Sequence, residues 1–185
     1  MRKIVLLGDS IRQIGYGKKV EEMMKSYFQV WQPEDNCRFA KYTLRLLFEC
    51  QEQIKGADVI HWNNGLWDVC DILGDGPFSP MDEYMENMLR IADILLKWGK
   101  NVIFATTTPT HPDYMYGAYE RTRQYNEKLV PELEKRGVRI NDLFAVMDGH
   151  RLDGICADQI HLNELGIELC AQQVVKEIRA ALGEQ

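Results

Sequence analysis

Ile4-Val5-Leu6-Leu7-Gly8-Asp9-Ser10 is an apolar run that ends abruptly on small and polar residues, and it decides the fold. A short aliphatic run bounded by a turn is typical of a strand buried on both faces of a parallel sheet. Glycine at position 8 permits a sharp bend at the carboxyl end of that strand. We therefore expect the Ser10 hydroxyl at the edge of the sheet where α/β proteins bind ligands.

The rest of the chain alternates short apolar runs with longer amphipathic ones, which predicts repeated βα units around a parallel sheet. We expect strands at residues 3–7, 27–31, 58–62, 101–106 and 138–140. Helices are expected at residues 17–26, 41–54, 80–98, 119–136 and 163–182. The length of 185 residues suits one domain, so residues 1–185 are predicted to form a single α/β domain.

Near the other end of the chain, Asp158-Gln159-Ile160-His161 places a carboxylate shortly before an imidazole. A serine hydroxyl is a weak nucleophile, and it needs both a base and a group that orients the base. Ser10, His161 and Asp158 can fill these roles if their loops meet at one edge of the sheet. Each motif also has a simpler interpretation, because Asp9 or Ser10 could cap the first helix and the second motif could open the last helix.

A third polar group follows the strand expected at residues 58–62, where the sequence reads Asn63-Asn64-Gly65. An asparagine at the end of one strand, beside a serine at the end of its neighbour, can donate an amide N–H to an oxyanion. Asn63 and Asn64 could equally be turn formers that tolerate left-handed backbone angles.

In this order, Gly8-Asp9-Ser10, Asn63 and Asp158-x-x-His161 resemble the motifs of the SGNH/GDSL hydrolase family of esterases and lipases, over essentially the whole chain. The resemblance implies a flavodoxin-like three-layer α/β/α sandwich with a parallel five-stranded sheet. It also implies a nucleophile at Ser10, an acid/base at His161 and an orienting carboxylate at Asp158. The Ser10 N–H and the Asn63 side chain are the implied oxyanion donors.

Two positions depart from the family pattern. The third block commonly reads Gly-x-Asn-Asp, so spacing alone does not choose between Asn63 and Asn64, although similarity to related members favours Asn63. The second block should offer a glycine, but residues 33–38 contain none. A backbone N–H needs no particular side chain, so Arg38 or a neighbour is the expected further donor. The Arg38 side chain could instead contact an anionic substrate group.

The remaining histidines have less specific surroundings. His61 lies within a strand and is predicted to be hydrogen-bonded and partly buried rather than catalytic. His111 follows the fourth strand, where it could line the substrate pocket or form a surface turn. Asp9, His61, Asp158 and His161 lack the close spacing of zinc motifs, so we expect no metal. No cofactor is expected either, because the glycine-rich motifs that bind nucleotides are missing.

Charge and cysteine content indicate the surroundings. A net charge of −6 argues against nucleic acid or an anionic membrane as a partner. Five cysteines without a Cys-x-x-Cys pair predict reduced thiols, as in a cytoplasmic protein. The N-terminal segment does not resemble a signal peptide, and no stretch is apolar enough to span a membrane. The expected partner is a small-molecule ester, and the sequence does not indicate an oligomeric state.

These observations predict a carboxylic ester hydrolase that forms an acyl-enzyme on Ser10. A small O-acyl ester, such as an acetylated carbohydrate, is the expected substrate, because no long lipid-binding lid is evident. The aromatic segment at residues 114–119 could line an acyl or sugar pocket, form a lid or contact another subunit. A second hypothesis is a non-catalytic ligand-binding module on the same fold, which the missing glycine favours. A third, phosphate-ester or nucleotide binding at the first βα turn, depends only on helix polarity.

Overall fold

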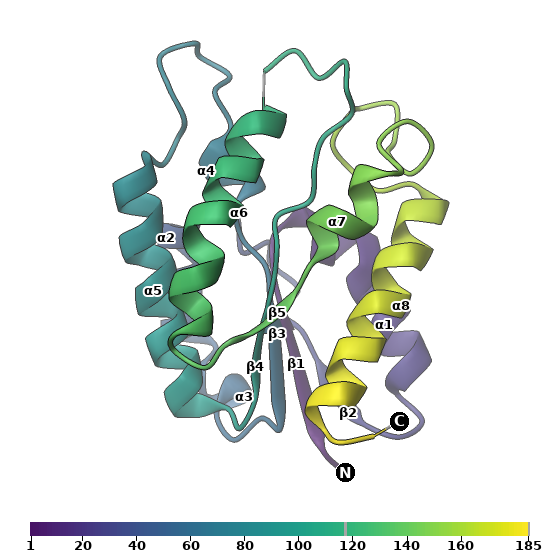
Figure 1. The fold of residues 1–185 in the computed structure, drawn as a ribbon. Helices are drawn as coiled ribbons and strands as arrows, with labels where there is room; N and C mark the ends of the chain where they lie inside the picture. Colours follow the sequence, from purple (N-terminus) through teal and green to yellow (C-terminus); the bar gives the residue numbers. More distant parts are fainter. Residues whose placement is uncertain (117, 185) are drawn as a thin grey trace.

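The computed structural model describes residues 1–116 and 118–184, and its centre is a parallel five-stranded sheet (Figure 1). The strand order is β2-β1-β3-β4-β5. Chain order therefore reverses at β1, which lies between β2 and β3, and ligands of doubly wound sheets bind at such a point. The strands are β1 (Lys3–Leu7), β2 (Gln29–Trp31), β3 (Val59–Trp62), β4 (Val102–Ala105) and β5 (Arg139–Asn141).

Helices cover both faces of the sheet and complete the expected three-layer sandwich (Figure 1). One face carries α1 (Gly17–Met24), α7 (Leu143–Asp148) and α8 (Glu164–Ala181). The other carries α2 (Ala40–Glu49), α3 (Gln51–Ile54), α5 (Met81–Trp98) and α6 (Ala118–Glu134). A π-helical segment, η1 (Ile11–Tyr16), follows β1, and the short α4 (Leu66–Val69) follows β3. Among the described residues, no helix has the length and apolar character needed to cross a membrane.

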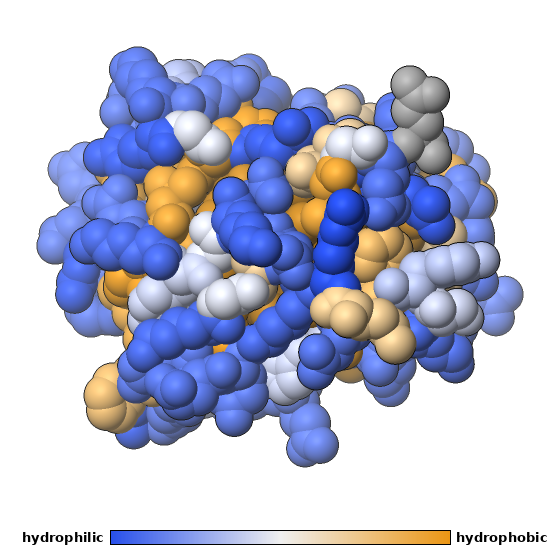
Figure 2. Space-filling view, turned by 90° about the horizontal axis from the view of Figure 1, so that it is seen from below, coloured by the Kyte–Doolittle hydropathy of each residue, from blue (hydrophilic) through white to orange (hydrophobic). Residues whose placement is uncertain are grey.

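The side chains of the strands pack into two apolar cores, one on each face of the sheet. Along β1, Ile4 and Leu6 pack under α1 and α8, whereas Val5 and Leu7 pack under α2 and α5, and all four side chains are fully buried. A strand buried on both faces reads as a continuous apolar run, which is why β1 shows no alternation. The rigid strand fixes the turn that follows it. At the opposite end of the molecule the surface is mostly hydrophilic, with smaller apolar areas between (Figure 2).

The observed elements differ from the predicted ones in a few places. Strand β2 starts later than expected because Tyr27 and Phe28 still donate to the Met24 carbonyl in the turn that ends α1. The helix predicted at residues 41–54 is two helices, since the backbone leaves the helical region at Cys50 (φ −102°, ψ 14°). The segments η1, α4 and α7 were not expected, because runs this short carry too little apolar periodicity.

The register between β1 and β3 brings two of the sequence motifs together. Leu7 lies opposite Trp62, and the Asn63 N–H donates to the Leu7 carbonyl over 3.2 Å. Gly8 and Asn63 therefore lie side by side at the carboxyl edge of the sheet. A Cβ on Gly8 would overlap the Asn63 side-chain oxygen, so this close approach requires glycine.

Candidate active site

Ser10, His161 and Asp158 meet at the carboxyl edge of the sheet, although the serine and the histidine are 151 positions apart in the chain. The Ser10 Oγ lies 2.8 Å from His161 Nε2, and His161 Nδ1 lies 2.8 Å from Asp158 Oδ2. The hydroxyl, the imidazole and the carboxylate thus form one continuous hydrogen-bonded chain. This is the geometry in which an imidazole can take the serine proton while a carboxylate orients the ring.

The turn that carries Asp158 and His161 is fixed by its own backbone. Asp158 Oδ1 accepts from the N–H groups of Ile160 (3.0 Å) and His161 (2.9 Å). Gln159, between them, has a left-handed backbone (φ 71°), and its carbonyl accepts from the His111 N–H over 2.9 Å. Burial acts to raise the pKa of Asp158, but the two N–H groups and His161 outweigh it and hold the pKa below its usual value. Asp158 therefore stays ionised beside the imidazole.

The Asn63 side chain is held at both ends. Its Oδ1 accepts from the Tyr16 hydroxyl over 2.8 Å, and its Nδ2 donates to Asp9 Oδ1 over 2.8 Å. Asp9 Oδ1 also accepts from the Ile11 N–H over 2.9 Å, so the amide lies against the residues on either side of Ser10. An amide nitrogen carries two hydrogens, and within the described residues only Asp9 accepts one. The other remains available to a bound group.

Asp9 is fully buried beneath this turn. Burial raises its pKa, against the opposing effects of the Asn63 amide, the Ile11 N–H and the nearby Arg12. Its second oxygen, Oδ2, is buried and finds no partner among residues 1–116 and 118–184. The carboxyl group therefore serves as an internal acceptor that orients Asn63.

The side chain of Asn64, the alternative donor, is held by hydrogen bonds to the surrounding protein. Its Oδ1 accepts from Thr43 Oγ1 (3.0 Å) and Trp62 Nε1 (3.1 Å), and its Nδ2 donates to the Arg38 carbonyl over 2.8 Å. The side chain is fully buried. The geometry thus favours Asn63 over Asn64 as the amide that faces a substrate.

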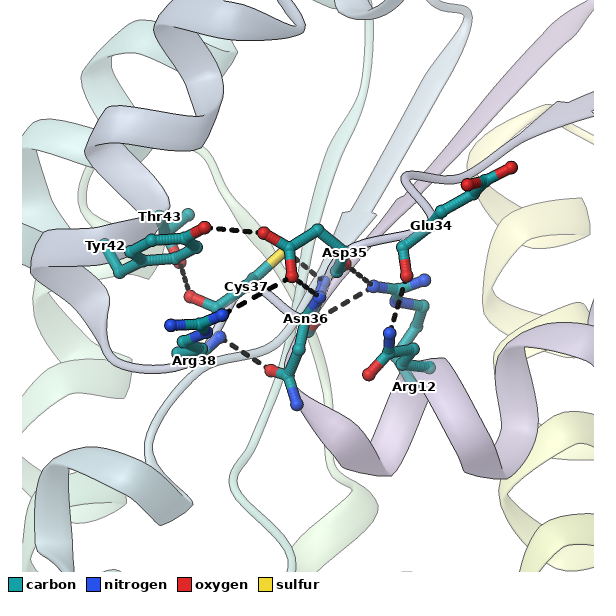
Figure 3. A network of polar contacts seen from close by, with 10 residues as sticks. Arg12, Glu34, Asp35, Asn36, Cys37, Arg38, Tyr42 and Thr43 are labelled. Carbon is teal, nitrogen blue, oxygen red and sulfur yellow. Dashed lines mark hydrogen bonds and ion pairs between the residues drawn. The ribbon is translucent and has the colours of Figure 1, made fainter.

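The loop at residues 33–38 is held beside Ser10 by the buried Arg12 (Figure 3). The Arg12 guanidinium donates to the carbonyls of Pro33 (2.9 Å), Asp35 (2.9 Å) and Gly8 (3.1 Å). Cys37 joins the same loop to the serine turn, because its N–H donates to the Gly8 carbonyl (3.0 Å) and its Sγ accepts from the Gly8 N–H (3.1 Å). Nothing in the sequence marks Arg12 as an arginine that will be buried, so the residues alone do not single it out.

Arg38 lies in this loop with a left-handed backbone (φ 50°). Its N–H donates to Asn36 Oδ1 over 2.7 Å, and its guanidinium lies over the Tyr42 ring at 4.5 Å (Figure 3). The N–H groups of Asn36 and Cys37 are paired as well, with Asp35 Oδ1 and the Gly8 carbonyl. The geometry therefore speaks against the expected Arg38 N–H as an oxyanion donor. For the Ser10 N–H, by contrast, the structure gives no acceptor within the described residues.

The other candidate histidines lie outside the reactive chain. His61 is fully buried, and its Nε2 lies 3.0 Å from Asn141 Nδ2. Burial lowers the pKa of His61 to about 3, so the ring is neutral and unsuited to acid–base chemistry near neutral pH. His111 supports the Gln159 carbonyl through its backbone and is absent from the lining of the cleft beside Ser10. In the described part of the chain, no group of three His, Cys, Asp or Glu side chains could hold a metal ion.

Ser10 and His161 open into a cleft of about 460 Å³. Most of its lining is apolar. Besides Ser10, it comes from η1, the loop at residues 33–38, α4 and the loop that follows it, the segment after β4 and the turn before α8. Of the aromatic segment at residues 114–119, Tyr114 lines the cleft and Gly117 lies outside the described residues. Ile72 and Phe78 belong to this lining, although no motif marks them in the sequence. Their signal is that two large apolar residues occur in a Gly/Pro-rich loop. The lining residues are Ser10, Gln13, Ile14, Asn36, Leu66, Trp67, Cys70, Ile72, Phe78, Tyr114, Ile160 and His161.

Comparisons with known proteins agree with this fold. No family model matches the chain. A curated relative, the GDSL esterase/lipase WDL1 of Oryza sativa subsp. japonica, is 25% identical over 183 residues, which cover 90% of this chain and 68% of the relative. Among solved structures, the acetylxylan esterase Axe2 of Geobacillus stearothermophilus superposes with a TM-score of 0.78 at 16% identity, covering 96% of this chain and 94% of Axe2. A lipase/acylhydrolase of Enterococcus faecalis superposes with a TM-score of 0.77 at 21% identity, covering 97% and 96% of the two chains.

The solved structures share the three-layer fold with its parallel five-stranded sheet, which confirms the predicted fold class. The curated relative adds a similarity in sequence over most of the chain. Together they confirm the resemblance to the SGNH/GDSL hydrolase family and support a carboxylic ester hydrolase of that type.

Proposed function

We propose that the protein is a serine esterase that acts through an acyl-enzyme on Ser10. The observation that carries the proposal is the unbroken hydrogen-bonded chain from the Ser10 hydroxyl through His161 to Asp158. In the first step His161 takes the serine proton as Ser10 attacks the ester carbonyl, and the alcohol leaves with that proton. In the second step His161 takes a proton from water, which attacks the acyl-enzyme and releases the acid.

The oxyanion of each tetrahedral intermediate is assigned to two donors. One is the second N–H of Asn63, whose first N–H is held by Asp9, and the other is the Ser10 N–H. Donors fixed before the reaction stabilise developing charge without reorganising. Replacement of Asn63 by alanine should therefore lower kcat by about 100- to 1,000-fold, as at comparable sites.

The proposed substrate is a small O-acyl ester, with an acetylated carbohydrate as one candidate. Its support is the similarity to Axe2, an acetylxylan esterase. Structures of Axe2 include catalytic mutants with alanine in place of a serine, an aspartate and a histidine, and that aspartate and histidine stand three positions apart, as Asp158 and His161 do. Trp67 and Tyr114, in the lining of the cleft, are rings on which a sugar could stack.

The first experiment is hydrolysis of p-nitrophenyl acetate by the wild-type protein beside Ser10→Ala, with the fold of both checked by circular dichroism. Turnover that disappears with the hydroxyl supports the serine mechanism. Equal turnover by both folded proteins would refute the role of Ser10. Absence of turnover in both, with equal binding of an ester, would favour the non-catalytic binding module instead.

We further infer a cytoplasmic, single-domain enzyme over residues 1–185 that does not act on nucleic acid or at a membrane. Five cysteines are free in the structure, which suits a reducing compartment. The net charge of −6 disfavours polyanionic partners. Fractionation of cells that express the tagged full-length chain tests the compartment, and recovery in an extracellular or membrane fraction would contradict it.

A further inference from the structure

Large apolar side chains gather around the Ser10 hydroxyl while remaining open to solvent. Ile14 is 58% exposed, Ile72 and Phe78 are each 49% exposed, and Trp67 is 38% exposed. All four line the cleft that contains Ser10 and His161, although they come from three separate segments. A contiguous exposed apolar surface next to reactive groups is typical of a ligand-binding cleft.

The loop that carries Ile72 and Phe78 forms one wall of the cleft, and hydrogen bonds hold it on both sides. Ser79 donates to the buried Asp68 carboxylate through Oγ (2.6 Å), and the Phe78 N–H donates to the Cys70 carbonyl (2.9 Å). On the other side, Arg121 donates to the Val69 carbonyl (2.7 Å) and lies 3.3 Å from Asp71 Oδ2. These contacts hold the apolar wall in place before any ligand arrives, so binding does not have to order the loop.

The cleft offers few partners to a polar ligand. Apart from Ser10 and His161, its hydrogen-bonding side chains are Gln13 and Asn36, with the Tyr114 hydroxyl, the Cys70 thiol and the Trp67 indole N–H. The Gln13 amide donates to the Glu34 carbonyl, and Asn36 Oδ1 accepts from the Arg38 N–H. Tyr114 and Cys70 lie 3.9 Å apart and pair with each other. A sugar carries several hydroxyls, and the few remaining polar groups of the cleft would leave some of them without partners, which costs free energy.

We propose that this cleft binds a hydrocarbon group of the ester. Among the small O-acyl esters proposed above, the enzyme then prefers those with a medium-length apolar chain, and this choice sets aside the acetylated-carbohydrate candidate. The proposal rests on the proposed function, because it takes Ser10 as the nucleophile. The reaction remains ester hydrolysis, and the cleft holds either the acyl chain or the alkyl chain of the alcohol. Each methylene that enters an apolar cleft should raise kcat/KM by about fourfold, the equivalent of about 0.8 kcal/mol.

Two ester series test the proposal and distinguish the two sources of the chain. One lengthens the acyl group, from p-nitrophenyl acetate through butyrate and hexanoate to octanoate, and the other lengthens the alcohol in alkyl acetates. We expect kcat/KM to rise with length in one series until the cleft is filled. No rise in either series, or faster turnover of an acetylated xylooligosaccharide than of every longer ester, would overturn the proposal.

Substitutions in the cleft test whether its apolar side chains cause the preference for longer esters. Phe78→Ser and Ile72→Asn should reduce the hexanoate-to-acetate ratio of kcat/KM several-fold, whereas Phe48→Ser, at a residue 68% exposed on α2 and outside the cleft, should leave it unchanged. An unchanged ratio in both cleft variants would also overturn the proposal.

Binding to Ser10→Ala separates this inference from the catalytic mechanism. Ethyl hexanoate should quench the fluorescence of Trp67 in the cleft at a lower concentration than ethyl acetate does, and Trp67→Phe identifies the signal. Equal affinity for the two esters would contradict the apolar cleft even if the serine mechanism holds. Tighter binding of the hexanoate without Ser10-dependent turnover in the wild type would preserve the cleft and refute the mechanism.

Discussion

The Tyr16 hydroxyl donates a hydrogen bond of 2.8 Å to the side-chain oxygen of Asn63, and both side chains are buried. Burial raises the pKa of Tyr16 well above its usual value, so the hydroxyl keeps its proton and stays a donor. The bond determines which end of the amide is oxygen. The nitrogen then faces Asp9 and the serine turn, which is the orientation that an oxyanion donor needs.

Replacement of Tyr16 by phenylalanine should lower kcat by up to about tenfold, because a hydrogen bond worth about 1 kcal/mol no longer orients the amide. KM should change little, since the Tyr16 side chain is not part of the cleft lining. Steady-state kinetics with p-nitrophenyl acetate measures both constants. The matched control is Tyr27→Phe, at a tyrosine that is 68% exposed. An unchanged kcat in Tyr16→Phe, or a loss as large as in Asn63→Ala, would contradict this positioning role.

Replacement of Gly8 by alanine should lower both stability and kcat. The added Cβ would overlap the Asn63 side-chain oxygen and approach Arg12 Cβ at 2.8 Å, so the asparagine has to move away from the serine turn. Overpacking of this kind typically costs about 1 to 3 kcal/mol. The control is Gly149→Ala, where a Cβ meets nothing within 4 Å and the backbone is helical. Gly8→Ala should show a lower melting temperature and a lower kcat than Gly149→Ala. Equal values for the two variants would show that the close approach of Gly8 to Asn63 is dispensable.

The sequence predicts those parts of the site whose chemistry is local. Ser10 follows a continuous apolar strand, and Asp158 and His161 share one short turn, so strand ends and motif spacing place all three. That residues 1–185 form one domain stays a prediction. Asn63 and Asn64 are equivalent by residue type, and only their tertiary partners distinguish them.

Other features depend on contacts between distant segments, which a single sequence does not display. In the sequence Arg12 is an ordinary polar residue of an amphipathic turn. Only in the fold does the loop after β2 bring the carbonyls of Pro33 and Asp35 to its guanidinium. The sequence allows the Arg38 N–H as an oxyanion donor, but in the fold this N–H donates to the side chain of Asn36. Ile72 and Phe78 form a wall of the cleft because Asp68 and Arg121 hold their loop in place through hydrogen bonds. Both residues are remote from Ser10 in sequence.

Replacement of Arg12 by methionine should destabilise the protein by about 2 to 4 kcal/mol, because the carbonyls of the loop at residues 33–38 lose a charged donor in a buried place. The apolar stem is retained, so the loss reports on the hydrogen bonds. Chemical denaturation measures the change. Arg45→Met is the control, since the Arg45 side chain is 59% exposed. It pairs with Glu49 and lies over the Phe48 ring at the surface, where an ion pair contributes about 0 to 1 kcal/mol. Equal destabilisation in the two variants would contradict the role of Arg12 as an anchor of the loop.

Asp68 gives the protein a predictable dependence of stability on pH. Its buried carboxyl accepts from Ser79 Oγ (2.6 Å) and from the Ala40 N–H (3.1 Å). Burial, opposed by these hydrogen bonds, raises the pKa of Asp68 to about 7 from its usual 3.8. Between these two values the folded protein retains a proton that the unfolded chain has released. The free energy of unfolding should therefore fall as the pH rises from about 4 to about 7, by at most about 1.4 kcal/mol per pH unit from this group.

Asp68→Asn removes this titration while keeping an oxygen that can accept from Ser79. Its stability relative to the wild type should therefore increase steadily from about pH 4 to pH 7 and then level off, because above pH 7 the wild type bears the full cost of a buried charge. Urea denaturation at a series of pH values measures the difference. Asp75→Asn, at an exposed position in the loop that follows α4, is the control for the removal of a surface carboxylate. A constant difference between Asp68→Asn and the wild type would show that Asp68 titrates alike in the folded and unfolded states.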